Sequence, residues 1–401
     1  MAVDWSTLPD DLVGEIAIKL ESCDDFIYFS TVCRSWNRAS SLIKNLWTAT
    51  PVPWLLLAQN TEINHKCPRN IFKLNNNKRY SLNLPEMYGA RCWGSPYGWV
   101  AMVKHDLSVQ LFNPITKANI SFPSLQTIPS LPIYEPPDNE VPWFDYNEWL
   151  LAAFLQKVIV LKVSQAGGHH EFVIMLLSVF MKGPIFAKHG DQSWTTILIK
   201  EPKVSVFDVV VMDDLVFALY GYEGAIAYWS VTEFYGLGVV KPMVYLTGKY
   251  RIFASANSAY LVQSGSDLLL VIRFKLGQMD LDDIYYDDYE IAHRTIDFKI
   301  YKLNPNDKNW ESVEDLGDVA LFVGENSSMA VSSAHAKGLQ RSCIYFTDDE
   351  SEVWLYPSER TLLAGHDMSV FDIKTNMTEL FYEDNDTRSS VCSPTWFVPH
   401  F

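Results

Sequence analysis

The first forty residues carry apolar side chains at helical spacing. In residues 6–39, STLPDDLVGEIAIKLESCDDFIYFSTVCRSWNRA, these side chains recur every three or four positions in two groups. The first group is Leu8, Leu12, Ile16 and Leu20, and the second is Phe26, Phe29, Cys33 and Trp36, with Val32 beside it. The pattern predicts two short amphipathic helices. Their apolar residues outnumber what so small a unit can bury in itself, which indicates a binding partner.

Polar residues mark where the two helices begin. Ser6 or Thr7 can cap the first helix, with Pro9 near its first helical position, where a missing N–H costs little. The two aspartates after Pro9 complement the positive end of that helix. Asp24 or Asp25 opens the second helix.

Beyond residue 47 the pattern changes to short runs of β-branched and aromatic residues, separated by turn signals and without a long helical period. This change predicts an all-β domain. The candidate strands are 99–103, 108–113, 158–163, 172–180, 195–199, 204–212, 215–220, 225–231, 268–274, 295–303, 343–347, 353–356 and 369–373. Tight turns such as Asp213-Asp214, between two apolar runs, indicate antiparallel meanders.

A weak internal repeat predicts how the meanders assemble. Segments 109–125, 298–316 and 368–383 each hold an alternating strand, an Asn-Pro or Asp turn and a second strand that starts with an apolar or aromatic residue. This is the outer hairpin of a propeller blade. At about 45 to 50 residues per blade, we expect six or seven kelch-like blades, and the irregular spacing of the repeats requires insertions between them.

Composition supports a small head followed by one large domain. The chain has 401 residues, of which 48% are hydrophobic and 14% aromatic, enough for a sizeable core. We therefore expect an all-α head over residues 1–47 and an all-β propeller over residues 48–401.

The head resembles the F-box, the adaptor-binding motif of substrate receptors in cullin-based ubiquitin ligases. The resemblance rests on Leu8-Pro9 with the acidic pair after it, on the turn from Ile16 to Leu20, on the opening at 24–26 and on the ending VCRSW at 32–36. It implies that the Leu-Pro corner and the apolar helix faces pack against a Skp-type adaptor, which links the receptor to cullin. The contact set implied by the resemblance is Leu8, Pro9, Leu12, Ile16, Leu20, Val32, Cys33 and Trp36.

The larger domain resembles the KIB-type β-propeller of plant F-box proteins. The markers, in chain order, are CWGSPYGW at 92–99, LFNP at 111–114, GENSSMAV at 324–331, CIYFTDD at 343–349 and PTWF at 394–397. The resemblance implies a propeller that presents a face to a target protein. Nothing in these residues identifies the target.

Charge and cysteine usage favour an intracellular protein, in the nucleus, the cytoplasm or both. The net charge of −16 and the lack of a basic run argue against a nucleic-acid partner. The six cysteines have no CxxC spacing and are expected to be free thiols. The N-terminus lacks a secretory signal pattern, and the apolar runs are too short for a membrane helix, so no membrane association is predicted.

One acidic segment interrupts the strand pattern. Residues 280–290, DLDDIYYDDYE, contain six acidic residues and no basic ones. A solvated surface loop is the simplest interpretation, and attraction of a basic segment of a target is the functional alternative. The segment lacks the glycine and terminal glutamate of a calcium loop. The candidate residues are Asp280, Asp282, Asp283, Asp287, Asp288 and Glu290.

Motifs for catalysis are missing from the sequence. HExxH, GxSxG and phosphate-binding glycine loops do not occur, and no cofactor or metal site is predicted. The sequence therefore predicts a non-catalytic substrate receptor of a Skp-cullin-F-box ubiquitin ligase. Two alternatives remain: a binding module or inhibitor that acts without ubiquitin, and a propeller hydrolase or sugar-binding protein with a ligand in its channel.

Overall fold

The computed structural model describes most of the chain. The described residues are 4–20, 23–43, 52–58, 69–129, 131, 146–164, 170–178, 180–181, 183–197, 205–220, 225–230, 241–244, 258–276, 294–304, 309–334, 336, 338–349, 367–382 and 393–400.

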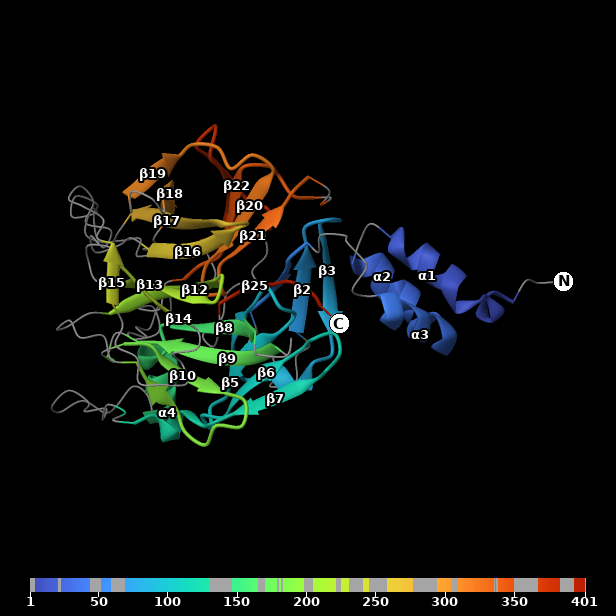
Figure 1. The fold of residues 1–401 in the computed structure, drawn as a ribbon, viewed down its shortest axis with the longest axis horizontal. Coiled ribbons are helices and arrows are strands. Elements are labelled where there is room, and N and C mark those ends of the chain that lie inside the picture. Colours follow the sequence, from blue (N-terminus) through green and yellow to red (C-terminus); the bar gives the residue numbers. More distant parts are fainter. Residues whose placement is uncertain are drawn as a thin grey trace, which may run out of the picture.

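A helical head forms the N-terminal part (Figure 1). It consists of a 3-10 turn, η1 (Trp5–Thr7), and the helices α1 (Asp10–Ile18), α2 (Cys23–Ser30) and α3 (Arg34–Ile43). Helix α3 packs against both α1 and α2. No helix among the described residues is long and apolar enough to cross a membrane.

The strands form six sheets, which are the six blades of a propeller (Figure 1). Blade 1 contains β25 (Thr395–Phe397), β1 (Trp54–Leu56), β2 (Arg69–Lys73) and β3 (Lys78–Leu82). Blade 2 contains β4 (Arg91–Gly94), β5 (Val100–Val103), β6 (Val109–Phe112) and β7 (Asn119–Phe122). Blade 3 contains β8 (Lys157–Ser164), β9 (His170–Leu177), β10 (Ile185–Lys188) and β11 (Thr195–Thr196).

Blades 4 to 6 follow in chain order. Blade 4 contains β12 (Val206–Met212), β13 (Leu215–Tyr220), β14 (Ala225–Ser230) and β15 (Lys241–Val244). Blade 5 contains β16 (Ser258–Ser264), β17 (Asp267–Leu276), β18 (Arg294–Asn304) and β19 (Asn309–Val313). Blade 6 contains β21 (Met329–Ser332), β20 (Val319–Val323), β22 (Cys343–Phe346), β23 (Ser369–Asp372) and β24 (Met377–Glu379).

Short helical segments occupy some of the connections. They are the 3-10 turns η3 (Pro85–Met87) and η4 (Leu125–Thr127), the helix α4 (Tyr146–Trp149) and the π-helix η5 (Leu150–Phe154). The predicted strand 353–356 lies outside the described residues.

The two ends of the propeller chain close the ring together. The C-terminal strand β25 pairs antiparallel with β1, with Trp54 opposite Phe397 and Leu56 opposite Thr395. The inner strands β25, β4, β8, β12, β16 and β21 follow one another around the ring, and each contacts the next from β25 to β21. An apolar cluster that contains Met329 of β21 and Trp396 of β25 closes the ring. The sequence did not predict β1 or β25, because three-residue strands carry almost no periodic signal.

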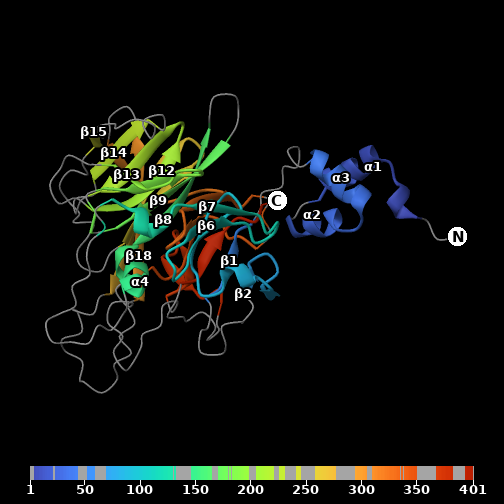
Figure 2. The same cartoon turned by 90° about the horizontal axis from the view of Figure 1, so that it is seen from below.

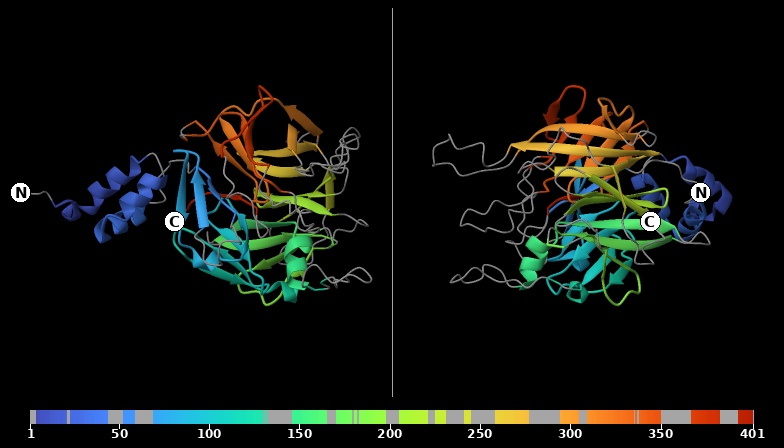
Figure 3. Two further views of the ribbon diagram at one scale, coloured as in Figure 1. Left: turned by 180° about the vertical axis from the view of Figure 1, so that it is seen from behind. Right: turned by 60° about the vertical axis from the view of Figure 1, so that its left-hand side comes forward.

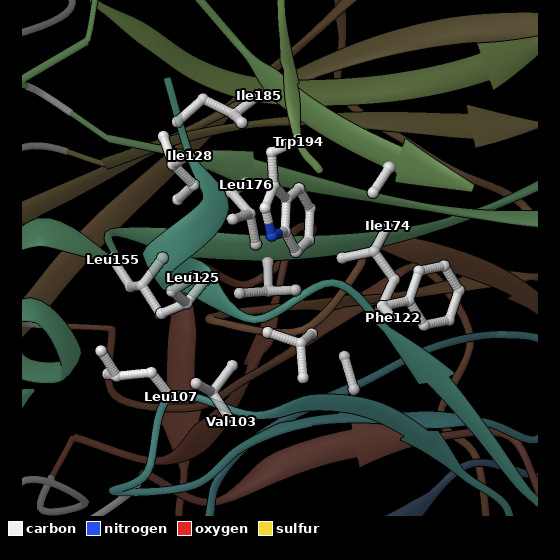
Figure 4. Close-up of a cluster of buried hydrophobic side chains, with 14 of the residues drawn as sticks. Val103, Leu107, Phe122, Leu125, Ile128, Leu155, Ile174, Leu176, Ile185 and Trp194 are labelled. Carbon is white, nitrogen blue, oxygen red and sulfur yellow. The ribbon is translucent and has the colours of Figure 1, made fainter. Parts of the chain in front are cut away.

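Apolar side chains fill the interfaces between blades. Each inner strand turns alternate residues toward its two neighbouring blades, so Val158 and Val160 of β8 pack toward blade 2 while Ile159 and Leu161 pack toward blade 4. Figure 4 shows the cluster between blades 2 and 3, in which Trp194 lies among aliphatic side chains and donates its Nε1 proton to the Pro123 carbonyl at 3.0 Å. Six such clusters, one for each interface, form the core.

The three repeated hairpins are the outer strand pairs that the sequence predicted. They are β6–β7, β18–β19 and β23–β24. The turn residue has the same role in two of them: Asn113 Oδ1 accepts the N–H groups of residues 115 and 116, and Asp372 Oδ1 accepts those of 374 and 375. Local turn chemistry therefore explains why the repeat was visible in the sequence.

The propeller has two distinct faces. Since blades 2 to 5 are antiparallel meanders, their inner strands β4, β8, β12 and β16 begin at one face, here called the far face, and end at the other. Strand β1 runs opposite to β25, so the head joins the propeller at the face where the inner strands end, here called the F-box face. Figures 1 and 3 show the head and the C-terminal end on one side of the propeller and α4 on the other, and Figure 2 shows the same head beside blade 1. Ile27 of α2 packs against the apolar cluster between blades 1 and 2.

Candidate adaptor-binding and target-binding surfaces

The start of the head differs in detail from the sequence prediction. The cap belongs to Asp4, whose carboxylate accepts the N–H and the hydroxyl of Ser6 at 3.0 and 2.6 Å and thereby begins η1. These hydrogen bonds lower the pKa of Asp4. Leu8 and Pro9 form the corner between η1 and α1, and Pro9 precedes α1 rather than lying inside it. The predicted caps, Ser6 and Thr7, do not cap α1.

The second predicted helix is two helices. Residues 26 to 36 keep a helical spacing in sequence, but α2 ends at Ser30 and α3 begins at Arg34, so Val32 and Cys33 lie in the turn. The Ser30 and Thr31 hydroxyls donate to the carbonyls of Ile27 and Tyr28 at 2.8 and 2.9 Å. Such side-chain bonds to the last carbonyls, together with two β-branched residues in succession, favour the end of a helix.

The start of α3 docks against η1. The Ser35 hydroxyl donates to the Ser6 carbonyl, and Trp36 Nε1 donates to the Trp5 carbonyl, both at 3.0 Å. Arg38 binds the Asp10 carboxylate through two nitrogens at 2.9 and 3.0 Å. These contacts bring the Leu8-Pro9 corner next to the turn that carries Val32 and Cys33. The two ends of the motif, separate in the sequence, therefore form one surface.

The eight predicted contact residues divide between the core of the head and its surface. Leu8, Leu20 and Trp36 pack against the core formed by Val13, Ala17, Phe26, Phe29 and Ala39. Cys33 is half-buried, and Pro9, Leu12, Ile16 and Val32 are exposed. The Ser35 hydroxyl lies 3.0 Å from the Cys33 thiol. The hydrogen bond with this hydroxyl and a second one with the Trp36 N–H lower the pKa of the thiol. The Trp36 ring also packs against the Phe29 ring, with ring centres 4.4 Å apart, so Trp36 has a structural role within the head.

The head is unusually apolar on its outside. Seven of the thirteen large hydrophobic residues exposed in the described part of the chain lie in it, although it is about a tenth of the protein. They are Trp5, Leu12, Ile16, Ile18, Tyr28, Val32 and Leu42. Such a concentration of exposed apolar side chains is typical of a protein-binding site, and three of the seven, Leu12, Ile16 and Val32, belong to the contact set implied by the F-box resemblance.

The centre of the propeller is occupied by the turn that joins β20 to β21. This turn contains the sequence GENSS at 324–328 and leads from β20 into β21, the innermost strand of blade 6. Glu325 pairs with Arg91 of blade 2 at 2.9 Å, and the Ser327 N–H donates to the Gly94 carbonyl at 3.0 Å. The Ser327 hydroxyl accepts the Val160 N–H of blade 3 at 3.1 Å. The turn thus connects blade 6 to two blades across the ring.

Asp208 of blade 4 joins the same network. Its carboxylate pairs with Lys157 of blade 3 at 3.0 Å, accepts the Leu261 N–H of blade 5 at 2.9 Å and accepts the Ser328 hydroxyl at 3.2 Å. All these partners come from different blades. Asp208 therefore helps to hold four blades in register.

A second buried network lies where blades 5 and 6 meet at the far face. Arg273 pairs with Asp349 at 3.0 Å and with Asp367 at 2.8 Å, and Lys275 pairs with Asp349 at 2.8 Å. Burial alone would raise the pKa of Asp349, but Lys275 and Arg273 hold it well below its usual range. Burial and the Asp349 charge raise the pKa of Tyr260, which donates to that carboxylate. The TDD part of the CIYFTDD marker thus takes part in a structural ion network.

Among the described residues, no group of three or more His, Cys, Asp or Glu side chains is arranged to hold a metal ion. Cys33, Cys92 and Cys343 are free thiols, and burial raises the pKa of Cys343 to about 12. The acidic candidates Asp280, Asp282, Asp283, Asp287, Asp288 and Glu290 lie outside the described residues.

The propeller matches a known family. The family model described as KIB1-4 beta-propeller covers residues 71–372, three quarters of the chain. The chain belongs to this family. The F-box domain model covers residues 5–48 and includes all of α1 to α3. The combination of an F-box domain and a KIB1-4 propeller is that of an F-box receptor protein, and the F-box domain implies binding to a Skp1-type adaptor.

Full-length relatives share both parts. The chain is 25% identical to the F-box protein At2g17036 of Arabidopsis thaliana, with 94% of this chain and 90% of that protein covered. It is 25% identical to the F-box protein SKIP23 of the same plant, with 94% and 91% covered. It is 23% identical to the F-box/kelch-repeat protein KIB1, also from Arabidopsis, with 90% and 83% covered. The resemblances to the F-box and to the KIB-type propeller are therefore confirmed.

Proposed function

We propose that this protein is the substrate-recognition subunit of a Skp-cullin-F-box ubiquitin ligase. The head binds the adaptor, and through it cullin, while the propeller holds a target protein. The observation that supports this most directly is the exposed apolar surface of the head, which includes Leu12, Ile16 and Val32. Burying such side chains against an adaptor contributes about 25 cal/mol for each Å² of apolar area removed from water.

The receptor itself performs no chemistry in this proposal. Its contribution is proximity, because a tethered target meets the ubiquitin-charged enzyme at a high effective concentration. The channel is filled at its axis by the GENSS turn, whose polar groups bind other blades. This arrangement favours a structural role over a catalytic one for the buried charges. We further propose that the protein acts inside the cell, in the nucleus, the cytoplasm or both.

The test is adaptor binding by designed surface variants. Leu12→Asp and Val32→Asp place a charge on side chains that are 48% and 59% exposed, so the fold of the head should tolerate them. If the adaptor covers these positions, each variant should weaken binding by about 100-fold, since burying an unpaired charge costs several kcal/mol. Isothermal titration with a recombinant Skp-type adaptor gives the affinity. Trp36→Ala is unsuitable, because Trp36 packs inside the head.

Leu42→Asp is the matched control. Leu42 is 72% exposed on α3 and lies outside the predicted contact set, so this variant should bind within about threefold of the unaltered chain. Equal affinity of all variants, or no adaptor binding by the unaltered chain, would contradict the proposal.

A second candidate function is a binding module that inhibits its target without ubiquitin. A target-binding face on the propeller would serve either role. A chain that lacks residues 1–47 distinguishes the two functions. An inhibitor keeps full activity in cells without its head, whereas a ligase receptor loses its activity. We also propose that the acidic segment 280–290 attracts basic segments of a target protein.

A further inference from the structure

The far face carries the longest connections of the propeller. The described turns at the F-box face are short, such as 113–118 between β6 and β7, 213–214 between β12 and β13 and 265–266 between β16 and β17. At the far face, 123–156 joins β7 to β8 and 277–293 joins β17 to β18. Long connections on a rigid scaffold are where binding residues concentrate.

Exposed apolar side chains of the propeller are also concentrated at this face. In the described part of the propeller, six large hydrophobic residues are exposed. Tyr146 and Phe180 lie in far-face connections, and Leu276 and Ile296 lie where β17 ends and β18 begins. The other two, Met377 and Leu380, belong to the outer edge of blade 6. Among the described residues, the far face therefore carries more exposed apolar side chains than the F-box face.

Tyr146 and Phe180 belong to one cluster of aromatic rings. Tyr146 stacks on Trp149 with ring centres 6.2 Å apart, and Trp149 contacts Phe180 at 5.5 Å. Phe180 also stacks on Phe154 at 6.4 Å. Tyr146 and Phe180 are 38% and 49% exposed, whereas Trp149 and Phe154 are buried beneath them. Aromatic residues that are partly exposed over a packed base are typical centres of protein interfaces.

The cluster is anchored to the centre of the propeller. Trp149 immediately precedes the π-helix η5, and Phe154 is its last residue. A π-helix is a rare element that is frequent at functional sites. Arg91 donates through Nη1 to the carbonyls of Leu151 and Leu155, the latter at 3.0 Å, and its Nη2 binds Glu325. The ion pair at the axis thus fixes the backbone that presents the rings. A preformed surface avoids part of the ordering entropy on binding.

Charge indicates the chemistry of the partner. The connection 123–156 contains five acidic residues, and 277–293 contains six, and neither contains Lys or Arg. Both connections start and end at far-face strand ends. Acidic sequences that join strand ends of this face, in a chain of net charge −16, favour a positively charged partner segment.

We propose that the far face is the target-binding face, and that the Tyr146, Trp149 and Phe180 cluster holds an apolar side chain from a target segment rich in Lys and Arg. This inference rests on the proposed receptor function, because it names the partner of the same propeller. The target is then held on the side of the propeller opposite the F-box (Figures 1 and 3). An adaptor bound to the head would therefore leave the target-binding face uncovered.

The test uses peptides as probes for the unidentified target. A phage-displayed library of random peptides is selected on the full chain, and enriched peptides are synthesised and titrated by fluorescence anisotropy. We expect an aromatic or large aliphatic residue flanked by Lys and Arg. Tyr146→Ser with Phe180→Ser should weaken binding at least tenfold, and affinity should fall as salt rises from about 0.05 to about 0.3 M.

Met377→Ser with Leu380→Ser is the matched control, because it removes two exposed apolar side chains from the edge of blade 6 and should leave the affinity within twofold. A photo-crosslinking p-benzoylphenylalanine in place of Phe180 keeps an aromatic ring there and should crosslink the peptide. Acidic enriched peptides, equal binding by both double variants, no crosslink or no enrichment would each overturn the inference.

Adaptor titration on the same proteins separates this inference from the receptor proposal. If the adaptor binds every variant but the far-face substitutions do not change peptide affinity, the inference fails and the receptor proposal stands. If peptides bind at the cluster but the full chain binds no adaptor, the receptor proposal fails and the far face remains a binding surface of a free-standing module.

Discussion

At the scale of single residues, buried and exposed ion pairs of the same chemistry have different roles in this molecule. Lys157 and Asp208 are 3.0 Å apart and almost fully buried between blades, and Lys302 and Asp267 are 2.9 Å apart at the surface of blade 5. Removing one partner of a buried pair leaves the other charge without compensation. The distances alone would not distinguish the two pairs, but their burial does.

We predict that Asp208→Asn destabilises the propeller by about 3 to 5 kcal/mol, since Lys157 is left charged in the interior. The same change also weakens the hydrogen bonds to Leu261 and Ser328. Urea denaturation followed by tryptophan fluorescence measures the loss.

Asp267→Asn is the matched control, and we expect it to cost less than about 1 kcal/mol because water screens the exposed pair. Similar urea midpoints for the two variants would mean that the Asp208 network does not stabilise the ring.

At the scale of elements, the C-terminal strand is a structural part of a blade that begins near the other end of the chain. Trp396 and Phe397 of β25 are fully buried and pack in the interfaces of blade 1 with blades 6 and 2. The side chain of Trp396 contacts Phe322 at 5.0 Å, and the Gly94 N–H donates to the Thr395 hydroxyl at 2.9 Å. Losing β25 would open two interfaces at once.

We predict that a chain ending at residue 392 lacks a closed propeller, because loss of the buried Trp396 and Phe397 side chains alone costs about 3 to 5 kcal/mol for each ring. Near-UV circular dichroism and limited proteolysis should show lost packing and rapid cleavage. A chain starting at residue 48 removes a longer terminal segment but no blade strand, so it should keep a native near-UV spectrum. An unchanged spectrum in the C-terminal truncation would contradict the proposed closure.

At the scale of the whole molecule, the head and the propeller differ in the size of their cores. Among the described residues of the head, only five hydrophobic residues are buried, and Ile27 makes an apolar contact with the propeller core. Each blade interface buries nine or more. A core as small as that of the head gives low stability by itself.

We predict that amide hydrogens of α1, α2 and α3 exchange much faster than those of β8, β9 and β17 in the free protein. Binding of the adaptor should slow exchange in the helices, since a ligand stabilises the folded state that it binds. Hydrogen exchange with mass spectrometry measures both, and the inner strands serve as the internal control. Equal protection of the helices and the inner strands in the free protein would indicate one cooperative unit.

The sequence by itself determined the features that depend on neighbouring residues. Helical spacing predicted the helical head, alternation predicted part of the strands, such as β8, β13 and β17, and the Asn113 and Asp372 turns revealed the outer hairpins. The break between α2 and α3 was missed because residues 26 to 36 keep a helical spacing across it. Local patterns also supported the resemblance to the F-box and to the propeller family.

The tertiary structure decided what depends on contacts between distant residues. It assigned Leu8, Leu20 and Trp36 to the core of the head and left Leu12, Ile16 and Val32 for a partner. It also placed Glu325 beside Arg91, 234 positions away in the chain, and made β25 the inner strand of blade 1. Closure of a ring is a global property, and no local pattern encodes which residues meet at its axis or share a face.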